Sequence, residues 1–253
     1  MATYDARATV LKKTKLGEAD LIITLIATDG RELRAVAKGA RKPGSRLGAR
    51  VEPFTVLEGQ FAVGRSLDVI SDVRTVATRL NLREDYDKLL AASVAAEMLE
   101  IVAAQAQGSE FLYEMSAALF DLMGACAAPV APQLLIAWML KLFAVLGYRP
   151  NLYDCAACGA EVSAGAEDRF CWSVESGGVI CAACGAGQFI PLATWPGAAL
   201  AWLRTLLGAT FAEVAVCELS PSLRRDLFSL VAAFAAEHFP ARLKALEFYQ
   251  QQT

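Results

Sequence analysis

Two cysteine pairs restrict what this chain of 253 residues can fold into more than any other feature. Cys155 and Cys158 form one C-x-x-C motif, and Cys181 and Cys184 form a second, with residues 159–180 between them. Each motif is a tight turn that points two sulfur atoms at one centre, so two motifs supply the four ligands of a tetrahedral zinc site. A site with all four positions filled by protein supports structure and leaves no position for a catalytic water. We therefore predict one structural zinc ion bound by these four cysteines.

The other cysteines bear on the alternatives to zinc and on the cell compartment. A pair of disulfides is the alternative for the two motifs, and Cys171 lies close enough in sequence to compete as a ligand. Disulfide scaffolds are typical of secreted proteins and need cysteines in pairs. The three remaining cysteines, Cys126, Cys171 and Cys217, are odd in number and scattered along the chain, which fits a reducing cytoplasm better. The N-terminal residues lack the apolar core of a signal peptide. Residues 134–146, the most apolar run, are interrupted by Lys141 and are too short to cross a membrane. We expect a cytoplasmic protein without a membrane segment.

The first 80 residues predict a small β-barrel. They contain five runs rich in valine, isoleucine, leucine and threonine, a composition typical of strands. These runs cover residues 3–11, 20–28, 31–39, 52–61 and 67–73. Asp29 and Gly30, between the second and third runs, are a strong hairpin signal. Five short strands separated by turn residues favour a five-stranded OB-fold, with an SH3-like barrel as the alternative.

The pattern changes to helical periodicity after Arg79. Apolar residues then recur at three- and four-residue spacing through residues 81–107, which predicts one long helix. Further helices are predicted over residues 109–126, 132–148, 196–209 and 220–238, with a turn or short helix after residue 241. The fold class is therefore an α+β multidomain chain. It combines an OB-fold domain (1–80), an α-helical domain (81–150 and 189–253) and an inserted zinc-ribbon-like module (151–188).

The net charge of −3 conceals an uneven distribution. Residues 1–83 contain 15 lysines and arginines and 9 acidic residues, a net charge of +6. The remainder contains 9 basic and 18 acidic residues, a net charge of −9. A basic N-terminal part joined to an acidic body indicates a nucleic-acid-binding face on the barrel.

Residues 38–50, which we call the basic segment, carry five cations and no acidic residue. Glycine, serine and proline between the cations predict a flexible loop after the third strand, with Arg34 and Lys38 on one face. Such side chains neutralise phosphates and give salt-dependent binding that is mostly independent of base sequence. A solvated loop that is basic for solubility is the alternative. The candidate DNA-binding residues are Arg34, Lys38, Arg41, Lys42, Arg46 and Arg50.

Motifs for catalysis are lacking in the sequence. His238 is the only histidine, which makes a Ser-His-Asp triad improbable, and there is no phosphate-binding P-loop. Zinc deamination requires an open metal position and a nearby glutamate, and a zinc ion held by four cysteines has no open position. We therefore predict that the chain is not an enzyme, with a zinc-dependent hydrolase or nuclease as the alternative to be tested.

The N-terminal half resembles the bacterial recombination mediator family RecO. The resemblance lies in Gly17-Glu18-x-Asp20, in Gly30, and in the stretch AKGARKPGSRLGARVEPF from Ala37 to Phe54. The Tyr148-Arg149-Pro150 sequence before the cysteine pairs and the helical remainder are also similar to this family, so the likeness covers essentially the whole chain.

The resemblance implies a fold, an activity and partners. It implies an OB-fold joined to a helical domain with a zinc-ribbon-like module. It implies binding of single- and double-stranded DNA, annealing of complementary strands, and work with RecR to load RecA onto DNA coated with single-strand-binding protein. It places the protein at the nucleoid in the cytoplasm. The alternative is a zinc-containing protein-interaction scaffold with only incidental DNA affinity.

Overall fold

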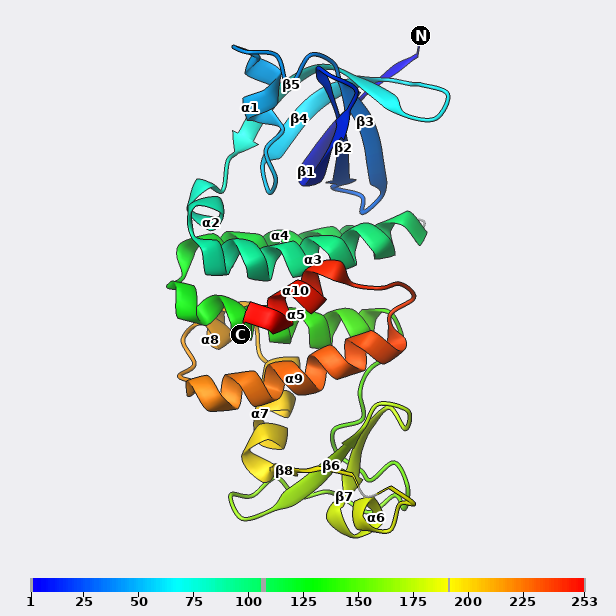
Figure 1. The fold of residues 1–253 in the computed structure, drawn as a ribbon, viewed down its shortest axis with the longest axis vertical. Helices are drawn as coiled ribbons and strands as arrows, with labels where there is room; N and C mark the ends of the chain where they lie inside the picture. Colours follow the sequence, from blue (N-terminus) through cyan, green and yellow to red (C-terminus); the bar gives the residue numbers. More distant parts are fainter. Residues whose placement is uncertain (1, 106–107, 191, 253) are drawn as a thin grey trace. The chain divides into compact units, whose positions relative to one another are not determined.

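The structure is a computed structural model that describes residues 2–105, 108–190 and 192–252 (Figure 1). The chain divides into two compact units, residues 1–128 and residues 129–253. Each unit has its own arrangement of elements and is described by itself. The three-domain division expected from the sequence stays a prediction.

A closed five-stranded barrel forms the N-terminal part of the first unit. Its strands are β1 (Thr3–Leu16), β2 (Asp20–Ala27), β3 (Glu32–Ala37), β4 (Val56–Ala62) and β5 (Asp68–Ala77). They close in the order β1-β2-β3-β5-β4, and β4 pairs back with β1. The β3–β5 pairing is parallel and all others are antiparallel. This five-stranded barrel confirms the prediction of an OB-fold.

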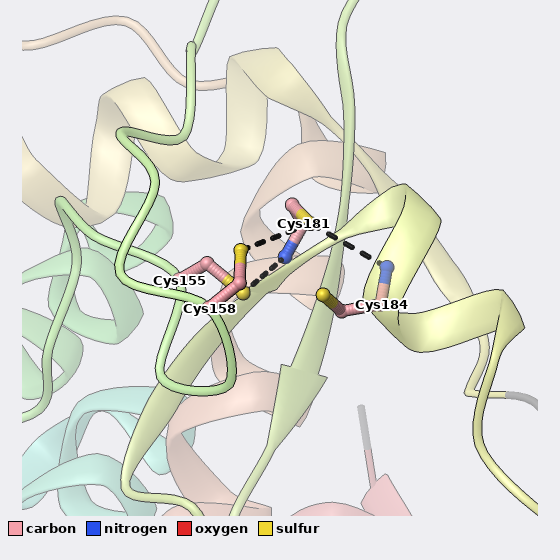
Figure 2. A group of neighbouring side chains, drawn as sticks. All are labelled: Cys155, Cys158, Cys181 and Cys184. Atoms are coloured by element: carbon pink, nitrogen blue, oxygen red, sulfur yellow. Dashed lines mark hydrogen bonds between the residues drawn. The ribbon is translucent and has the colours of Figure 1, made fainter.

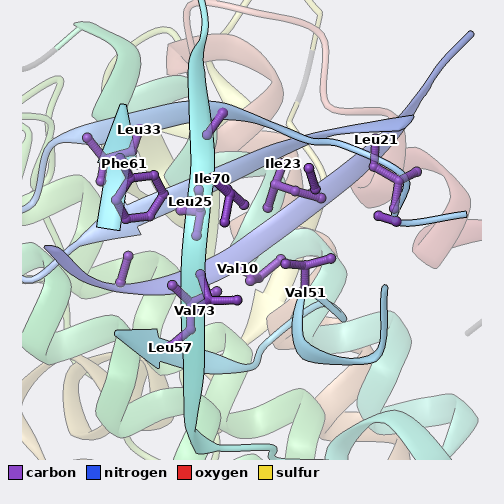
Figure 3. Packing of buried hydrophobic residues seen from close by; sticks show 14 of the residues in the cluster. Val10, Leu21, Ile23, Leu25, Leu33, Val51, Leu57, Phe61, Ile70 and Val73 are labelled. Carbon is purple, nitrogen blue, oxygen red and sulfur yellow. The ribbon is translucent and has the colours of Figure 1, made fainter. Parts of the chain in front are cut away.

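The barrel core follows from the alternation of side chains along each strand. In β2, for example, Leu21, Ile23 and Leu25 point inward, and Leu33 and Ala35 do the same in β3 (Figure 3). Because successive side chains point to opposite faces, this alternation fills the interior of the barrel with apolar residues. The outward-facing Thr24 and Ile26 of β2 are also buried, because a helix of the first unit packs on this strand. The other strands contribute inward residues Ala8, Val10, Leu57, Phe61, Ile70 and Val73.

The hairpin between β2 and β3 has the turn predicted from Asp29 and Gly30. Gly30 has φ of 81°, a conformation that favours glycine, and its N–H donates to Ala27 O. A Cβ at Gly30 would lie 2.2 Å from the backbone of Ser109, so only glycine fits there. The hairpin tip therefore lies directly against Ser109, the residue that precedes the helix beginning at Glu110.

The helices of the first unit are α1 (Arg46–Arg50), α2 (Leu80–Glu84), α3 (Tyr86–Gln105) and α4 (Glu110–Ala125). Ser109 caps α4 by accepting a hydrogen bond from the Leu112 N–H, as the predicted helix start requires. The single helix expected over residues 81–107 is instead two, because the backbone is extended at Asp85. Residues 106 and 107 of that expected helix lie outside the described residues.

Arg79 and Phe54 form the joint between the barrel and these helices. Phe54 is buried with φ of 66°, and its ring packs against Phe120 of α4. Arg79 has φ of 46° and donates to Phe54 O and Ala117 O, and its Nε lies 2.6 Å from Asp121 Oδ1. Two buried or nearly buried side chains at left-handed backbone positions thus fix where the barrel ends and the helices begin.

The second unit contains helices α5 (Ala131–Val145), α7 (Gly197–Gly208), α8 (Phe211–Ala215), α9 (Pro221–His238) and α10 (Lys244–Gln252), and a short 3-10 helix, Ala128–Val130, precedes α5. Ser220 caps α9 with Pro221 in its first turn, as predicted. Helix α8 was not predicted; it begins with a capping box in which Thr210 and Glu213 each bond the other's backbone.

Helix α5 corrects one expectation. Residues Ala128–Val145 are long and apolar enough to cross a membrane by length and composition, so the apolar run was not too short. Of this segment, 61% is buried, which is the pattern of a core helix. Its polar side chains have internal partners: Lys141 Nζ donates to Leu207 O, and Gln133 donates to Val214 O.

A small module that contains the cysteine pairs lies between α5 and α7. Its strands are β6 (Arg169–Ser173), β7 (Gly178–Cys181) and β8 (Thr194–Pro196), which form a sheet in the order β7-β6-β8, and α6 (Ala182–Ala186) follows β7. Helices precede and follow the module in the chain, as predicted for an insertion. Together with the barrel and the helices, it confirms the predicted fold class.

Candidate metal centre and nucleic-acid interface

The four predicted cysteines come together at one point. The sulfur atoms of Cys155, Cys158, Cys181 and Cys184 all lie within 4.8 Å of one another, and the Cys158 and Cys181 sulfurs are 4.0 Å apart (Figure 2). A tetrahedral zinc ion with bonds of about 2.3 Å places its sulfur ligands about 3.8 Å apart. The donor set therefore fits a zinc ion with a small inward adjustment.

Backbone N–H groups favour a thiolate at Cys155. Burial opposes this charge, but the N–H groups of Cys181, Cys158 and Ala157 donate to Cys155 Sγ and lower its pKa to about 6. The opposite holds at Cys184, whose pKa is raised to about 12 by hydrogen bonding to Cys181 and Cys158 and by burial. Four thiols in one place thus cannot all ionise without a cation, which is what a divalent metal supplies.

The glycine that follows each C-x-x-C motif is required by the local structure, for a different reason in each motif. Gly159 has φ of 73°, and its N–H donates to Cys155 O to close the first turn. Gly185 contacts Cys171: a Cβ at Gly185 would lie 2.2 Å from Cys171 Sγ. Cys171 is fully buried and packs behind the second turn, outside the group of four sulfurs. All seven cysteines are free thiols, so the disulfide alternative finds no support.

Two side chains from the helices hold the cysteine module in the second unit. Arg204 on α7 donates to Leu152 O and Val162 O, which flank the first cysteine pair, and stacks over the Tyr153 ring at 4.7 Å. His238 at the end of α9 makes a 2.9 Å hydrogen bond with Val174 O in the β6–β7 turn. The only histidine is therefore an attachment point of the module.

The basic segment is more ordered than the sequence predicted. Its second half is the helix α1, which begins with Ser45 accepting a hydrogen bond from the Gly48 N–H. The expectation of an irregular flexible loop was therefore wrong for residues 46–50. This short helix was missed because the glycines and the proline of the segment favour an irregular loop, although Ser45 is a residue type that commonly caps a helix.

The start of the basic segment is fastened to the β1–β2 turn, residues 17–20. Asp20 Oδ1 accepts a hydrogen bond from the Gly39 N–H at 2.7 Å. Arg41 donates twice, from its N–H to Ala19 O at 2.9 Å and from Nη1 to Gly17 O at 3.0 Å. Sequence reasoning assigned no role to Asp20, although its place in the Gly17-Glu18-x-Asp20 motif was a signal.

The candidate DNA-binding cations fall into two groups. Arg50 is half-buried and donates to Val73 O at 2.7 Å, so its charge is already engaged by the barrel. The others are exposed, and within the described residues Lys38, Lys42 and Arg46 have no side-chain hydrogen bond or ion pair. Arg34 is also exposed, on the outer face of β3. Arg41 is exposed but its guanidinium has one partner in Gly17 O.

Comparison with known proteins decides the family. Residues 1–79 match the family model described as Recombination protein O N terminal, and residues 83–247 match the model described as Recombination protein O C terminal. The chain belongs to the RecO family. A protein named DNA repair protein RecO from Nocardioides sp. is 34% identical over 254 residues, covering 98% of this chain and 99% of that protein. RecO proteins from Cutibacterium acnes and Streptomyces griseus are 31% and 32% identical, each over at least 97% of both chains.

RecO family membership confirms the resemblance seen in the sequence. It supports a role in DNA repair and recombination. The OB-fold barrel and the four-cysteine cluster described above are the parts of this chain on which such a role can be examined.

Proposed function

We propose that this chain is a DNA-binding recombination mediator that works without enzymatic turnover. The observation that supports it is the set of exposed cations Lys38, Arg41, Lys42 and Arg46 on one short segment of the barrel of a RecO-family chain. Lys38, Lys42 and Arg46 have no internal partner for their charge within the described residues, and Arg41 has only Gly17 O, so these cations can exchange their counterions for phosphates at little cost. Arg34 on the outer face of β3 is a further candidate contact, whereas the guanidinium of the candidate Arg50 is already hydrogen-bonded to Val73 O.

The mechanism is charge neutralisation. Two complementary strands repel each other through their phosphates, and a surface that neutralises some of those phosphates lowers the repulsion, so pairing proceeds by mass action. We expect binding to both single- and double-stranded DNA, because phosphate contacts do not read bases. Few aromatic side chains of the barrel are exposed, since Phe61 is buried in its core and Phe54 is buried against Phe120, so stacking contributes little.

The partners are proposals of the same kind. We infer that the chain acts with RecR on DNA coated with single-strand-binding protein and thereby helps RecA to load. The cysteine cluster would hold one zinc ion through Cys155, Cys158, Cys181 and Cys184, and the metal would brace the module and take no part in chemistry. A cytoplasmic, nucleoid-associated location follows from this role.

Charge reversal in the basic segment tests the proposal. The variant carries Arg41→Glu, Lys42→Glu and Arg46→Glu, and DNA affinity is measured by fluorescence anisotropy across a salt series. Each phosphate contact contributes about 0.7 to the slope of log affinity against log salt for single strands, so three lost contacts lower the slope by about 2. An unchanged affinity and slope would remove the segment from the mechanism.

A matched variant separates local contact from overall charge. Arg149→Glu, Arg169→Glu and Arg225→Glu change the net charge equally at exposed positions in the second unit. We expect this variant to keep the salt slope and the annealing rate of complementary oligonucleotides. Equal losses in both variants would show that net charge alone sets the affinity.

A protein-interaction scaffold is the second candidate function. Phe189 and Ile190 of the cysteine module are almost fully exposed, at 102% and 76%, and the chain after residue 83 carries a net charge of −9. This candidate predicts that RecR binding in a pull-down survives the charge reversal, whereas DNA binding is weak in the unaltered protein at physiological salt.

A further inference from the structure

The β1–β2 turn and the start of the basic segment form one hydrogen-bonded unit. Three bonds join them: Gly39 N–H to Asp20 Oδ1 at 2.7 Å, Arg41 N–H to Ala19 O at 2.9 Å, and Arg41 Nη1 to Gly17 O at 3.0 Å. Gly39 has φ of 65°, so the chain turns sharply at the point where the Asp20 carboxylate accepts its N–H. The position of the segment therefore depends on a turn that is about 20 residues earlier in the chain.

Asp20 is an unexpected residue at this place. A carboxylate beside a surface that attracts phosphates reduces that attraction, because like charges repel. Asp20 is partly buried and its carboxylate makes a short, charge-assisted hydrogen bond to the backbone of the segment. Glu18 in the same turn is exposed, and its carboxylate has no hydrogen bond or ion pair within the described chain. The two acids therefore have the same charge but different contacts.

We propose that Asp20 is a positioning residue that sets the conformation of the basic segment for DNA. This inference rests on the proposed function and adds a residue to it. With Asp20 in place, Lys38, Arg41 and Lys42 leave the barrel in a fixed direction and lose little freedom when phosphates bind. Without it, the Gly39 N–H has lost its acceptor, the segment samples other conformations, and DNA binding has to restore the order.

The negative charge of Asp20 and its role as a hydrogen-bond acceptor predict opposite changes in DNA affinity when the residue is replaced, so the inference can be tested. If Asp20 acts only as a negative charge, its removal raises DNA affinity by roughly two-fold, the size expected for one charge about 10 Å from phosphates in water. If it acts as an acceptor that positions the segment, Asp20→Ala lowers DNA affinity by about five-fold, the fold-change that corresponds to the net strength of one typical hydrogen bond. The two outcomes differ in sign.

The experiment compares three variants of the full chain. Asp20→Ala removes the charge and the acceptor, Asp20→Asn removes the charge and keeps an acceptor oxygen, and Glu18→Ala removes an equal charge from the same turn. Affinity for a single-stranded oligonucleotide is measured by anisotropy at fixed salt. We expect Asp20→Ala to bind about five-fold more weakly, and Asp20→Asn and Glu18→Ala to bind as tightly as the unaltered chain or up to about two-fold more tightly.

Hydrogen exchange without DNA separates this inference from the proposed function. We expect the Gly39 and Arg41 amides to exchange faster in Asp20→Ala and at the unaltered rate in Asp20→Asn and Glu18→Ala. Unchanged exchange at Gly39 in a folded Asp20→Ala variant would overturn the inference, as would tighter DNA binding by that variant. If exchange changes as expected but no variant alters DNA affinity, Asp20 positions the segment and the proposed function fails instead.

Discussion

Replacement of Arg79 should show how much one joint residue stabilises the first unit. The Arg79 side chain is only 6% exposed, and it donates to two backbone carbonyls, Phe54 O at 3.2 Å and Ala117 O at 3.4 Å. Each carbonyl that loses a charged donor costs about 1–2 kcal/mol. The ion pair with Asp121 adds little, because that carboxylate is 63% exposed. We expect Arg79→Ala to lower the free energy of unfolding by about 3 kcal/mol.

The backbone at Arg79 makes a second variant more informative. Glycine in place of alanine usually destabilises, but at a φ of 46° glycine relieves about 1 kcal/mol of steric strain. We therefore expect Arg79→Gly to be more stable than Arg79→Ala by about 1 kcal/mol, although both lack the guanidinium. Asp121→Asn, which removes only the ionic partner, should cost at most about 0.5 kcal/mol.

Hydrogen exchange is the assay that reports the right part of the chain. All four tryptophans lie after residue 128, so tryptophan fluorescence follows the second unit. Exchange of β4 and β5 amides gives the opening free energy of the barrel directly. An Arg79→Ala variant within about 0.5 kcal/mol of the unaltered chain, or one more stable than Arg79→Gly, would refute the reasoning.

Two further predictions concern the cysteine module. Metal analysis by mass spectrometry should find one zinc ion per chain. Cys181→Ser should lose the zinc, and Cys217→Ser should keep it because the Cys217 thiol lies outside the cluster. Full zinc in Cys181→Ser would count against the four-cysteine site. Arg204→Ala should raise the hydrogen-exchange rate of amides around Leu152 and Val162 by roughly ten-fold or more, because both carbonyls lose a charged donor. Arg204→Lys should restore the slow exchange only partly, since lysine lacks the guanidinium group that donates to both carbonyls. Unchanged exchange in Arg204→Ala would show that the arginine is not an attachment point.

Sequence reasoning succeeded where a short local pattern has one physical solution. The two C-x-x-C motifs, the Asp29-Gly30 turn and the Ser220 cap each specify geometry within a few residues, and each occurs as predicted. The runs rich in valine, isoleucine, leucine and threonine, separated by turn residues, likewise predicted the five strands.

The features that were missed depend on partners far along the chain. Asp20 at the start of β2 meets Gly39 just after the neighbouring strand β3, and Arg204 meets carbonyls more than 40 residues away. An aspartate in a turn and an arginine on a helix look like solvated surface residues until the fold brings their acceptors or donors close. The left-handed backbone at Arg79 was equally hidden, because arginine gives no sign of such a conformation.

The closure of the barrel restricts how a partner can engage it. An open sheet presents a row of unpaired N–H and C=O groups along its outermost strand, to which an extended peptide can add as a further strand. Here β1, β2 and β4 each pair with two neighbouring strands, so none of these three strands has a free edge. A partner that approaches β1, β2 or β4 must therefore be recognised through side chains and loop ends, and variants that alter single side chains are sufficient to map such a contact.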